Sequence, residues 1–295
     1  MMGRAVLTVV LAASLTAGLP AGEAPGVSFP DVLALPARPA DARIAYGPAP
    51  LQFGELWRPA GRGPHPVAIV IHGGCWSSEY GEGHIRPVCA ALARAGTAAW
   101  CLEYRRVGDE GGGWPGTFED VARGADHLRE IAPAHGLDLT RVAAVGHSAG
   151  GHLALWLAGR PRLPAGNPLR GKAPLPLRGV VALAPIPDLA RAASEHVCGN
   201  AVPDLLGGTP EAQPARYGTA SPMALLPLGV AQEIVHGRAD RIVPIGLSEA
   251  YVAAARGKGD AAHLVAVEGA GHFDVIAPTS KAWTAVEEAA RSLLR

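Results

Sequence analysis

The stretch Val142-Ala143-Ala144-Val145-Gly146-His147-Ser148-Ala149-Gly150-Gly151-His152-Leu153-Ala154-Leu155-Trp156 decides the fold. An apolar run rich in valine ends at Gly146, and a helical pattern rich in alanine and leucine begins after Ser148. The pattern predicts that Ser148 lies in the turn between a strand and a helix. Ser148 is therefore the candidate nucleophile of the chain.

Steric crowding explains why glycine stands two residues before and two residues after this serine. A strand that turns sharply into a helix brings backbone segments into contact, and a side chain at Gly146 or Gly150 would clash with them. The turn also places the amide of Ala149 at the start of the helix, where free N–H groups and the helix dipole favour an oxyanion. The spacing therefore predicts both an exposed hydroxyl and part of an oxyanion hole.

Other apolar runs have the length and composition of buried strands, and helical patterns separate them. They lie at residues 66–71, 97–105, 177–184, 231–237 and 262–268. This alternation predicts an α/β fold with a doubly wound, mostly parallel sheet.

One domain is expected over residues 51–295. Within it, residues 185–229 lose clear periodicity and are rich in proline and glycine, which indicates a small cap insertion above the strand ends. A helical pattern covers residues 117–131, with Thr117 as a candidate N-cap and Asp120 as its capping-box partner.

Two candidate partners for Ser148 follow the last two strands. Asp240 comes after the run at 231–237, and His272 comes after the run at 262–268. Because the carboxyl ends of parallel strands share one edge of a sheet, these side chains are expected to converge with Ser148. His272 would take the serine proton, and Asp240 would orient the imidazole. Asp188 and Asp274 remain alternative candidates for the acid.

A glycine-bearing loop, His72-Gly73-Gly74-Cys75-Trp76, follows the run at 66–71. Successive amides in such a loop can point at one anion. With this loop, the Gly146-His147-Ser148-Ala149-Gly150 turn and the Asp240 and His272 segments, residues 51–295 resemble the α/β-hydrolase superfamily, in its esterase branch with an HGGxW or HGGG motif. Kynurenine formamidase, bacterial carboxylesterases, and feruloyl or acetylxylan esterases share this motif.

The resemblance implies a serine hydrolase that cleaves carboxylic esters through an acyl-enzyme, without a metal or organic cofactor. Ser148, Asp240 and His272 would form the catalytic triad. The oxyanion hole would consist of the amides of Gly74, Cys75 and Ala149, and Trp76 would bind substrate. Cys75 departs from the third glycine of the HGGG form.

Composition favours a small-molecule partner, which the resemblance implies is an ester. The 295 residues carry 26 Lys and Arg against 26 Asp and Glu, and no basic block suggests nucleic-acid binding. None of the spacings of the four cysteines reads as a zinc site, and one or two disulfides are expected, with the pairing left open.

The N-terminus resembles an export signal. Arg4 precedes an uncharged apolar run at residues 5–17, and small residues suited to cleavage follow near residues 21–24. We therefore expect a signal peptide at residues 1–24, an extended lead-in at 25–50, and a secreted or periplasmic protein. The run is short for a membrane span, so no stable membrane anchor is expected.

Two other functions use the same features. An amide-directed hydrolase, of the arylformamidase or peptidase kind, would need the same triad with different pockets. A non-catalytic binding protein on this fold would be expected to lack one member of the triad, and all three are present in the sequence.

Overall fold

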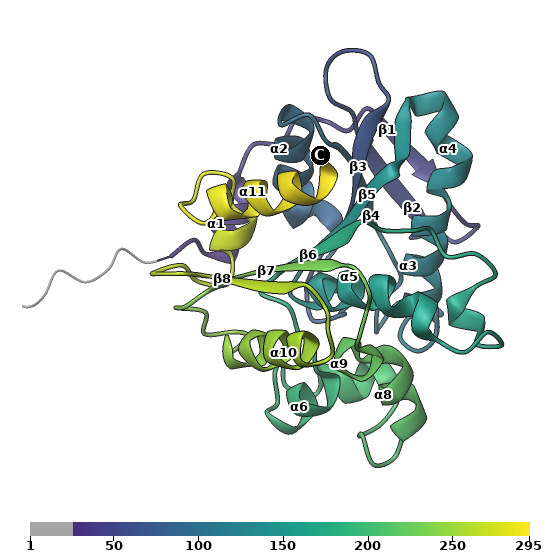
Figure 1. The fold of residues 1–295 in the computed structure, drawn as a ribbon, viewed down its shortest axis with the longest axis vertical. Helices are drawn as coiled ribbons and strands as arrows, with labels where there is room; N and C mark the ends of the chain where they lie inside the picture. Colours follow the sequence, from purple (N-terminus) through teal and green to yellow (C-terminus); the bar gives the residue numbers. More distant parts are fainter. Residues whose placement is uncertain (1–25) are drawn as a thin grey trace, which may run out of the picture.

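The computed structural model describes residues 26–295. Its strands join in one eight-stranded sheet with the order β1-β2-β4-β3-β5-β6-β7-β8 (Figure 1). The strands are β1 (Ala42–Ala45), β2 (Phe53–Trp57), β3 (His65–Ile71), β4 (Ala98–Leu102), β5 (Leu137–His147), β6 (Gly179–Leu183), β7 (Ala231–Gly237) and β8 (Ala262–Val267). β2 pairs antiparallel with β1 and β4, and every pair from β4 to β8 is parallel. The predicted α/β class and mostly parallel sheet are confirmed.

Helices cover both faces of this sheet (Figure 1). The α-helices are α1 (Phe29–Ala34), α2 (Arg86–Arg94), α3 (Gly116–Asp126), α4 (Leu128–His135), α5 (Ala149–Gly159), α6 (Leu189–Ser194), α7 (Ala201–Leu206), α8 (Pro214–Ala220), α9 (Pro222–Leu225), α10 (Gly246–Gly257) and α11 (Trp283–Leu294). Short 3-10 helices are η1 (Glu82–Ile85), η2 (Arg160–Arg162), η3 (Pro168–Arg170) and η4 (Asp274–Ile276).

The central strand β3 is buried on both faces, which explains why its sequence is an uninterrupted apolar run. Side chains alternate between the two faces of a strand. Val67, Ile69 and Ile71 lie in the core formed with α3, α5 and α10, whereas Ala68 and Val70 lie in the core formed with α2 and α11. Both faces are buried, so neither set of positions tolerates polar residues.

The N-terminal part of the described chain differs from the sequence predictions. The segment predicted as an extended lead-in contains α1 and the edge strand β1. Ser28 begins α1 with a capping box to Asp31, which stabilises this short helix. The predicted signal peptide at residues 1–24 lies outside the described residues.

Two internal segments, residues 185–229 and 117–131, contain more short helices than the sequence predicted. Residues 185–229, predicted as a cap insertion, contain α6 to α9 between β6 and β7, and α9 contacts α5 and α10. The predicted helix over 117–131 is divided into α3 and α4, and Pro115 rather than Thr117 precedes α3. The Thr117 hydroxyl instead donates to the carbonyl of Arg105 at 2.6 Å.

Candidate active site

Ser148 occupies the turn between β5 and α5, as predicted. Its backbone is held at φ 56° and ψ −120°, a conformation that non-glycine residues seldom adopt. A Cβ atom at Gly146 would collide with the carbonyl of Gly150, and one at Gly150 would collide with the carbonyls of Ile71 and His72. The two glycines are therefore required by close backbone contacts.

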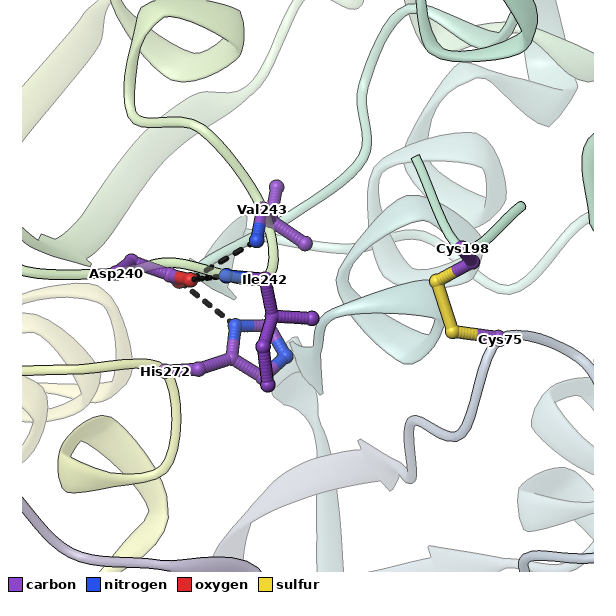
Figure 2. Close-up of a disulfide and its surroundings, with 6 residues drawn as sticks. All are labelled: Cys75, Cys198, Asp240, Ile242, Val243 and His272. Atoms are coloured by element: carbon purple, nitrogen blue, oxygen red, sulfur yellow. Dashed lines mark hydrogen bonds and ion pairs between the residues drawn. A yellow bond between two sulfur atoms is a disulfide. The ribbon is translucent and has the colours of Figure 1, made fainter. Parts of the chain in front are cut away.

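The loops after β7 and β8 bring Asp240 and His272 into direct contact. Nδ1 of His272 lies 2.7 Å from Oδ2 of Asp240 (Figure 2). This bond engages Nδ1, so Nε2 is the nitrogen that the imidazole can present to a hydroxyl. Ser148 and His272 line the same cavity. The structure thus brings the three predicted residues to one site.

The carboxylate of Asp240 is buried and held by several groups. Oδ1 accepts hydrogen bonds from the amides of Ile242 at 2.8 Å and Val243 at 2.9 Å (Figure 2). Oδ2 also lies 3.2 Å from Nε2 of His236, at the end of β7. Burial alone would raise the pKa of Asp240, but the hydrogen bonds from His236 and His272 outweigh it and hold the pKa well below its ordinary value.

The other two candidate acids have different partners. Asp188 is the N-cap of α6 and accepts the amide of Arg191 at 3.1 Å. Asp274 accepts the amides of Val27 at 3.1 Å and Gly271 at 2.9 Å. Neither carboxylate is hydrogen-bonded to His272, so Asp240 is the one of the three candidate acids that contacts the histidine.

Three successive residues of the loop after β3 have positive φ values. Gly74, Cys75 and Trp76 have φ values of 105°, 51° and 55°. Within residues 26–295, the amides of Gly74, Cys75 and Ala149 donate to no protein acceptor. These are the three groups predicted to form the oxyanion hole.

Buried polar side chains support this loop from behind. Nε2 of His72 lies 3.0 Å from the Glu103 carboxylate, and Nδ1 donates to the carbonyl of Gly73 at 2.8 Å. The Tyr104 hydroxyl donates to the carbonyl of His72 at 2.8 Å. Burial would raise the pKa of Glu103, but the adjacent His72 and Arg106 hold it well below its ordinary value. The loop therefore rests on a fixed, charged framework.

A disulfide joins this loop to the insertion between β6 and β7. Cys75 is bonded to Cys198, with the two Cα atoms 6.0 Å apart and a sequence separation of 123 (Figure 2). Cys89 and Cys101 are buried free thiols. The sequence left the pairing open, and the structure shows that one partner is a residue of the predicted oxyanion hole.

Trp76 has a different place from the one predicted. Its side chain is fully buried, and its Nε1 donates to Nδ1 of His152 at 3.2 Å. It is not among the residues that line the cavity beside Ser148. The Trp76 backbone has a positive φ, and its ring packs edge-on against His152 in the core. Trp76 supports the loop from the inside rather than facing a ligand in this cavity.

The cavity beside Ser148 is small and largely apolar. Its volume is about 190 Å³, and beyond the predicted site residues its walls are mainly aromatic and aliphatic side chains. They include Phe29, Tyr80, Ile242 and Phe273. Sequence reasoning missed Phe29 because it lies in the segment that was read as an extended lead-in. The capping-box pattern of Ser28 and Asp31 was the local signal for a helix there.

His147 also lines this cavity, next to the serine. Its Nε2 donates to the main-chain carbonyl of His272 at 2.9 Å. Its buried Nδ1 has no hydrogen-bond partner in the described part of the chain. Burial and the adjacent His272 hold the pKa of His147 well below the ordinary histidine value, so the ring is neutral.

Two further features concern possible ligands and location. Over residues 26–295, no group of three or more His, Cys, Asp or Glu side chains is arranged to hold a metal ion. In the same range, no helix has both the length and the apolar character needed to cross a bilayer.

A serine at the elbow after β5, an aspartate after β7 and a histidine after β8 of such a sheet define an α/β-hydrolase fold. Residues 55–254 match the BD-FAE family, and the chain belongs to that family.

Similar proteins are named as esterases. LipM of Mycobacterium tuberculosis, named as a probable carboxylic ester hydrolase, is 26% identical over 227 residues, which cover 72% of this chain and 51% of LipM. Esterase LipQ of the same organism is 26% identical, covering 74% of this chain and 53% of LipQ. The chain thus spans about half the length of these curated relatives.

Solved structures show the same fold at low sequence identity. Esterase B from Lactobacillus rhamnosis has a TM-score of 0.77 at 21% identity, covering 90% of each chain. A truncated carbohydrate esterase from gut microbiota has a TM-score of 0.74 at 20% identity, covering 86% of this chain and 98% of that one.

Proposed function

We propose that the protein is a serine hydrolase that cleaves carboxylic esters of short to medium acyl length through an acyl-enzyme. The observation that carries this proposal is the 2.7 Å bond between His272 and Asp240 beside the cavity that Ser148 lines. The esterase names of the similar proteins support it.

In the acylation step, the Ser148 hydroxyl oxygen attacks the ester carbonyl carbon and its proton passes to Nε2 of His272. The carbonyl oxygen becomes an oxyanion in a tetrahedral intermediate. The bond from carbon to the alcohol oxygen then breaks, and His272 gives its proton to the departing alcohol. Asp240 stabilises the transient imidazolium and keeps Nε2 directed at the reacting atoms.

In the deacylation step, water attacks the acyl carbon and gives its proton to His272. Collapse of the second tetrahedral intermediate breaks the bond to the Ser148 oxygen, which recovers the proton. A carboxylic acid is released and the enzyme is restored.

The oxyanion would be held by the amides of Gly74, Cys75 and Ala149. Donors that have no protein acceptor can bind developing charge without first breaking another bond, and each such donor is worth roughly 10²–10³ in rate. Ala149 adds the favourable field at the start of α5. The small cavity volume supports a preference for short to medium acyl groups over long chains.

The test is hydrolysis of p-nitrophenyl esters from acetate to laurate by the protein and by its Ser148→Ala variant. We expect fastest turnover of acetate or butyrate, and a loss of about 10⁴-fold or more in the variant. p-Nitroacetanilide, an amide of the same shape as the acetate, separates esterase from amidase activity. Equal turnover by the Ser148→Ala variant would overturn the assignment, and a preference for the anilide would make the protein an amidase.

We also propose that the protein is exported after removal of residues 1–24. The Cys75–Cys198 disulfide supports this proposal, because disulfides persist mainly in oxidising compartments. N-terminal sequencing of protein recovered outside the cytoplasm should begin close to residues 22–25. Recovery of the uncleaved chain in the cytoplasm would contradict export.

A further inference from the structure

We propose that helix α1 forms a wall of the substrate site and that Phe29 sets the size of the group bound beside Ser148. This inference deepens the proposed esterase function and rests on it. Helix α1 lies outside residues 51–295, the range over which the hydrolase domain is predicted.

The ring of Phe29 joins the two sides of the cavity. On one side it contacts Tyr80 and His84, with ring centroids 5.6 Å and 5.5 Å away. On the other side it contacts Phe273, which follows His272, at 5.5 Å. Tyr80 itself packs against Gly74, because a Cβ atom at Gly74 would collide with the Tyr80 side chain. Phe29 therefore bridges the oxyanion loop and the histidine loop.

Packing fixes the orientation of α1. Val32, one turn after Phe29, is fully buried in the core that also contains Ile85 of η1. Leu33 is 57% exposed and is not among the residues that line the cavity. Residues three apart share a helix face, so burial of Val32 holds Phe29 toward the cavity. Helix α1 contacts η1, and in Figure 1 it lies on the side of the sheet opposite α10.

Asp274 ties the start of α1 to the histidine loop. Its Oδ2 accepts the amide of Val27, just before α1, at 3.1 Å. The same oxygen accepts the amide of Gly271, which precedes His272, at 2.9 Å. Asp274 is only two residues from His272 in sequence, but its carboxylate accepts these two amides and is not hydrogen-bonded to the His272 ring.

An aromatic side chain in this position limits the cavity by its volume. The cavity of about 190 Å³ is small enough for one benzyl group to change which substrates fit. In apolar pockets, a difference of one methylene already changes selectivity by about 10–200-fold. Removing the Phe29 ring should therefore favour larger substrates, and enlarging it should exclude them.

The experiment compares the wild type with Phe29→Ala and Phe29→Trp. We measure kcat/KM for p-nitrophenyl acetate, butyrate and octanoate, and separately for methyl, ethyl and butyl acetates. In at least one series, Phe29→Ala should raise the ratio of the largest to the smallest substrate by about tenfold or more. Phe29→Trp should lower that ratio in the same series. Both kcat/KM values in a ratio are measured on the same enzyme sample, so the fraction of folded protein does not affect the ratio.

Leu33→Ala is the matched control, because it shortens an exposed side chain of the same helix that does not line the cavity. Its ratios should equal those of the wild type. If Phe29→Ala folds poorly, Phe29→Leu keeps an apolar side chain without the ring and should shift the ratio in the same direction. Ratios that stay within twofold in both series, or an equal shift in Leu33→Ala, would overturn the inference.

The Ser148→Ala variant separates this result from the proposed function. Turnover that is absent in the wild type, or retained in Ser148→Ala, refutes the esterase proposal. Wild-type turnover that is lost in Ser148→Ala, with unchanged ratios in Phe29→Ala, refutes only the role of α1.

Discussion

Nε2 of His147 donates a hydrogen bond to the main-chain carbonyl of His272, and the two imidazole rings pack with centroids 4.5 Å apart. A carbonyl oxygen only accepts, so this bond fixes the tautomer of His147. The residue beside the nucleophile thereby holds the backbone of the proposed general base.

Replacing His147 by phenylalanine should keep the packing and remove this hydrogen bond. A bond of this kind is worth about 0.5–1.5 kcal/mol, so kcat should fall roughly twofold to tenfold with little change in KM. His147→Gln, which retains an N–H donor, should recover much of the loss. Steady-state kinetics on p-nitrophenyl acetate give the answer, and equal losses in both variants would contradict a positioning role.

The Asp240→Asn variant should lose about 10⁴-fold in kcat, because an amide no longer fixes the productive tautomer of His272. Asp188→Asn is its matched control, since Asp188 caps α6 instead of contacting the histidine. The control should retain most of the activity. A larger loss in Asp188→Asn would show that the acid had been assigned wrongly.

The pH profile tests the same carboxylate. The pKa of Asp240 is held well below its ordinary value by His236 and His272 despite burial, so Asp240 stays charged across the mildly acidic range. Protonation of Asp240 should therefore make no contribution to the acid limb of kcat/KM above pH 4. Because the pKa of Glu82 is raised to about 7, the profile is also measured on Glu82→Gln. More than one protonation above pH 4 in Glu82→Gln would contradict the low pKa of Asp240.

The site residues that the sequence predicted are those set by local backbone rules. Gly146 and Gly150 are dictated by the elbow itself, and Asp240 and His272 by the convergence of parallel strand ends. Such rules need only the order of strands and turns. They were sufficient for the fold and for the Asp240–His272 contact.

The features that the sequence did not reveal depend on contacts between distant segments. Trp76 lies in the core, where its Nε1 donates to Nδ1 of His152, 76 residues away in sequence. Thr117 finds the Arg105 carbonyl rather than a helix terminus. Phe29 reaches the site on α1, which contacts η1 and has Val32 buried in the core. Each outcome was decided by tertiary packing.

The disulfide gives a prediction about the oxyanion loop. Cys198→Ala leaves the Cys75 amide in place but releases the loop from the insertion. Closing a loop of 123 residues stabilises a fold by about 2–4 kcal/mol, so the variant should unfold at a lower temperature. Its kcat should also fall, because the oxyanion donors are held less firmly.

Dithiothreitol should lower the activity of the wild type and have no further effect on Cys198→Ala. Cys89→Ala is the control, because Cys89 is a buried free thiol and its variant should respond to the reductant like the wild type. Wild-type activity that is insensitive to a reductant shown to open the bond would contradict a role in positioning the loop.

The last prediction concerns stability in acid. Burial lowers the pKa of His84 to about 3 and that of His152 to about 4, and it also lowers the pKa of His147. These rings are neutral in the fold but take up protons when the chain unfolds below about pH 6.5. Their contribution to stability is therefore complete above pH 6.5 and is lost as the pH falls toward 4.

Glu82 acts in the opposite direction and offsets part of this loss. Burial and its hydrogen bond to Glu103 raise its pKa to about 7, so the folded protein holds a proton there that the unfolded chain releases above about pH 4.5. The three histidines outweigh this one carboxyl group and leave a net uptake of protons on unfolding. Asp240 and Glu103, whose pKa values are depressed in the fold, add to that uptake toward pH 4.5. The free energy of unfolding in urea should consequently decrease between pH 6.5 and pH 4.5.

His152→Gln tests this explanation through the pH dependence of its free energy of unfolding, and not through the value of that free energy at one pH. The variant should take up about one proton fewer on unfolding in this range, so its free energy of unfolding should depend less steeply on pH. Trp76→Phe removes the hydrogen bond to His152 without removing a titrating group, and should lower stability while keeping the wild-type slope. Urea titrations followed by tryptophan fluorescence at pH 6.5, 5.5 and 4.5 measure both. A wild-type slope in His152→Gln would mean that this imidazole is already charged in the folded protein.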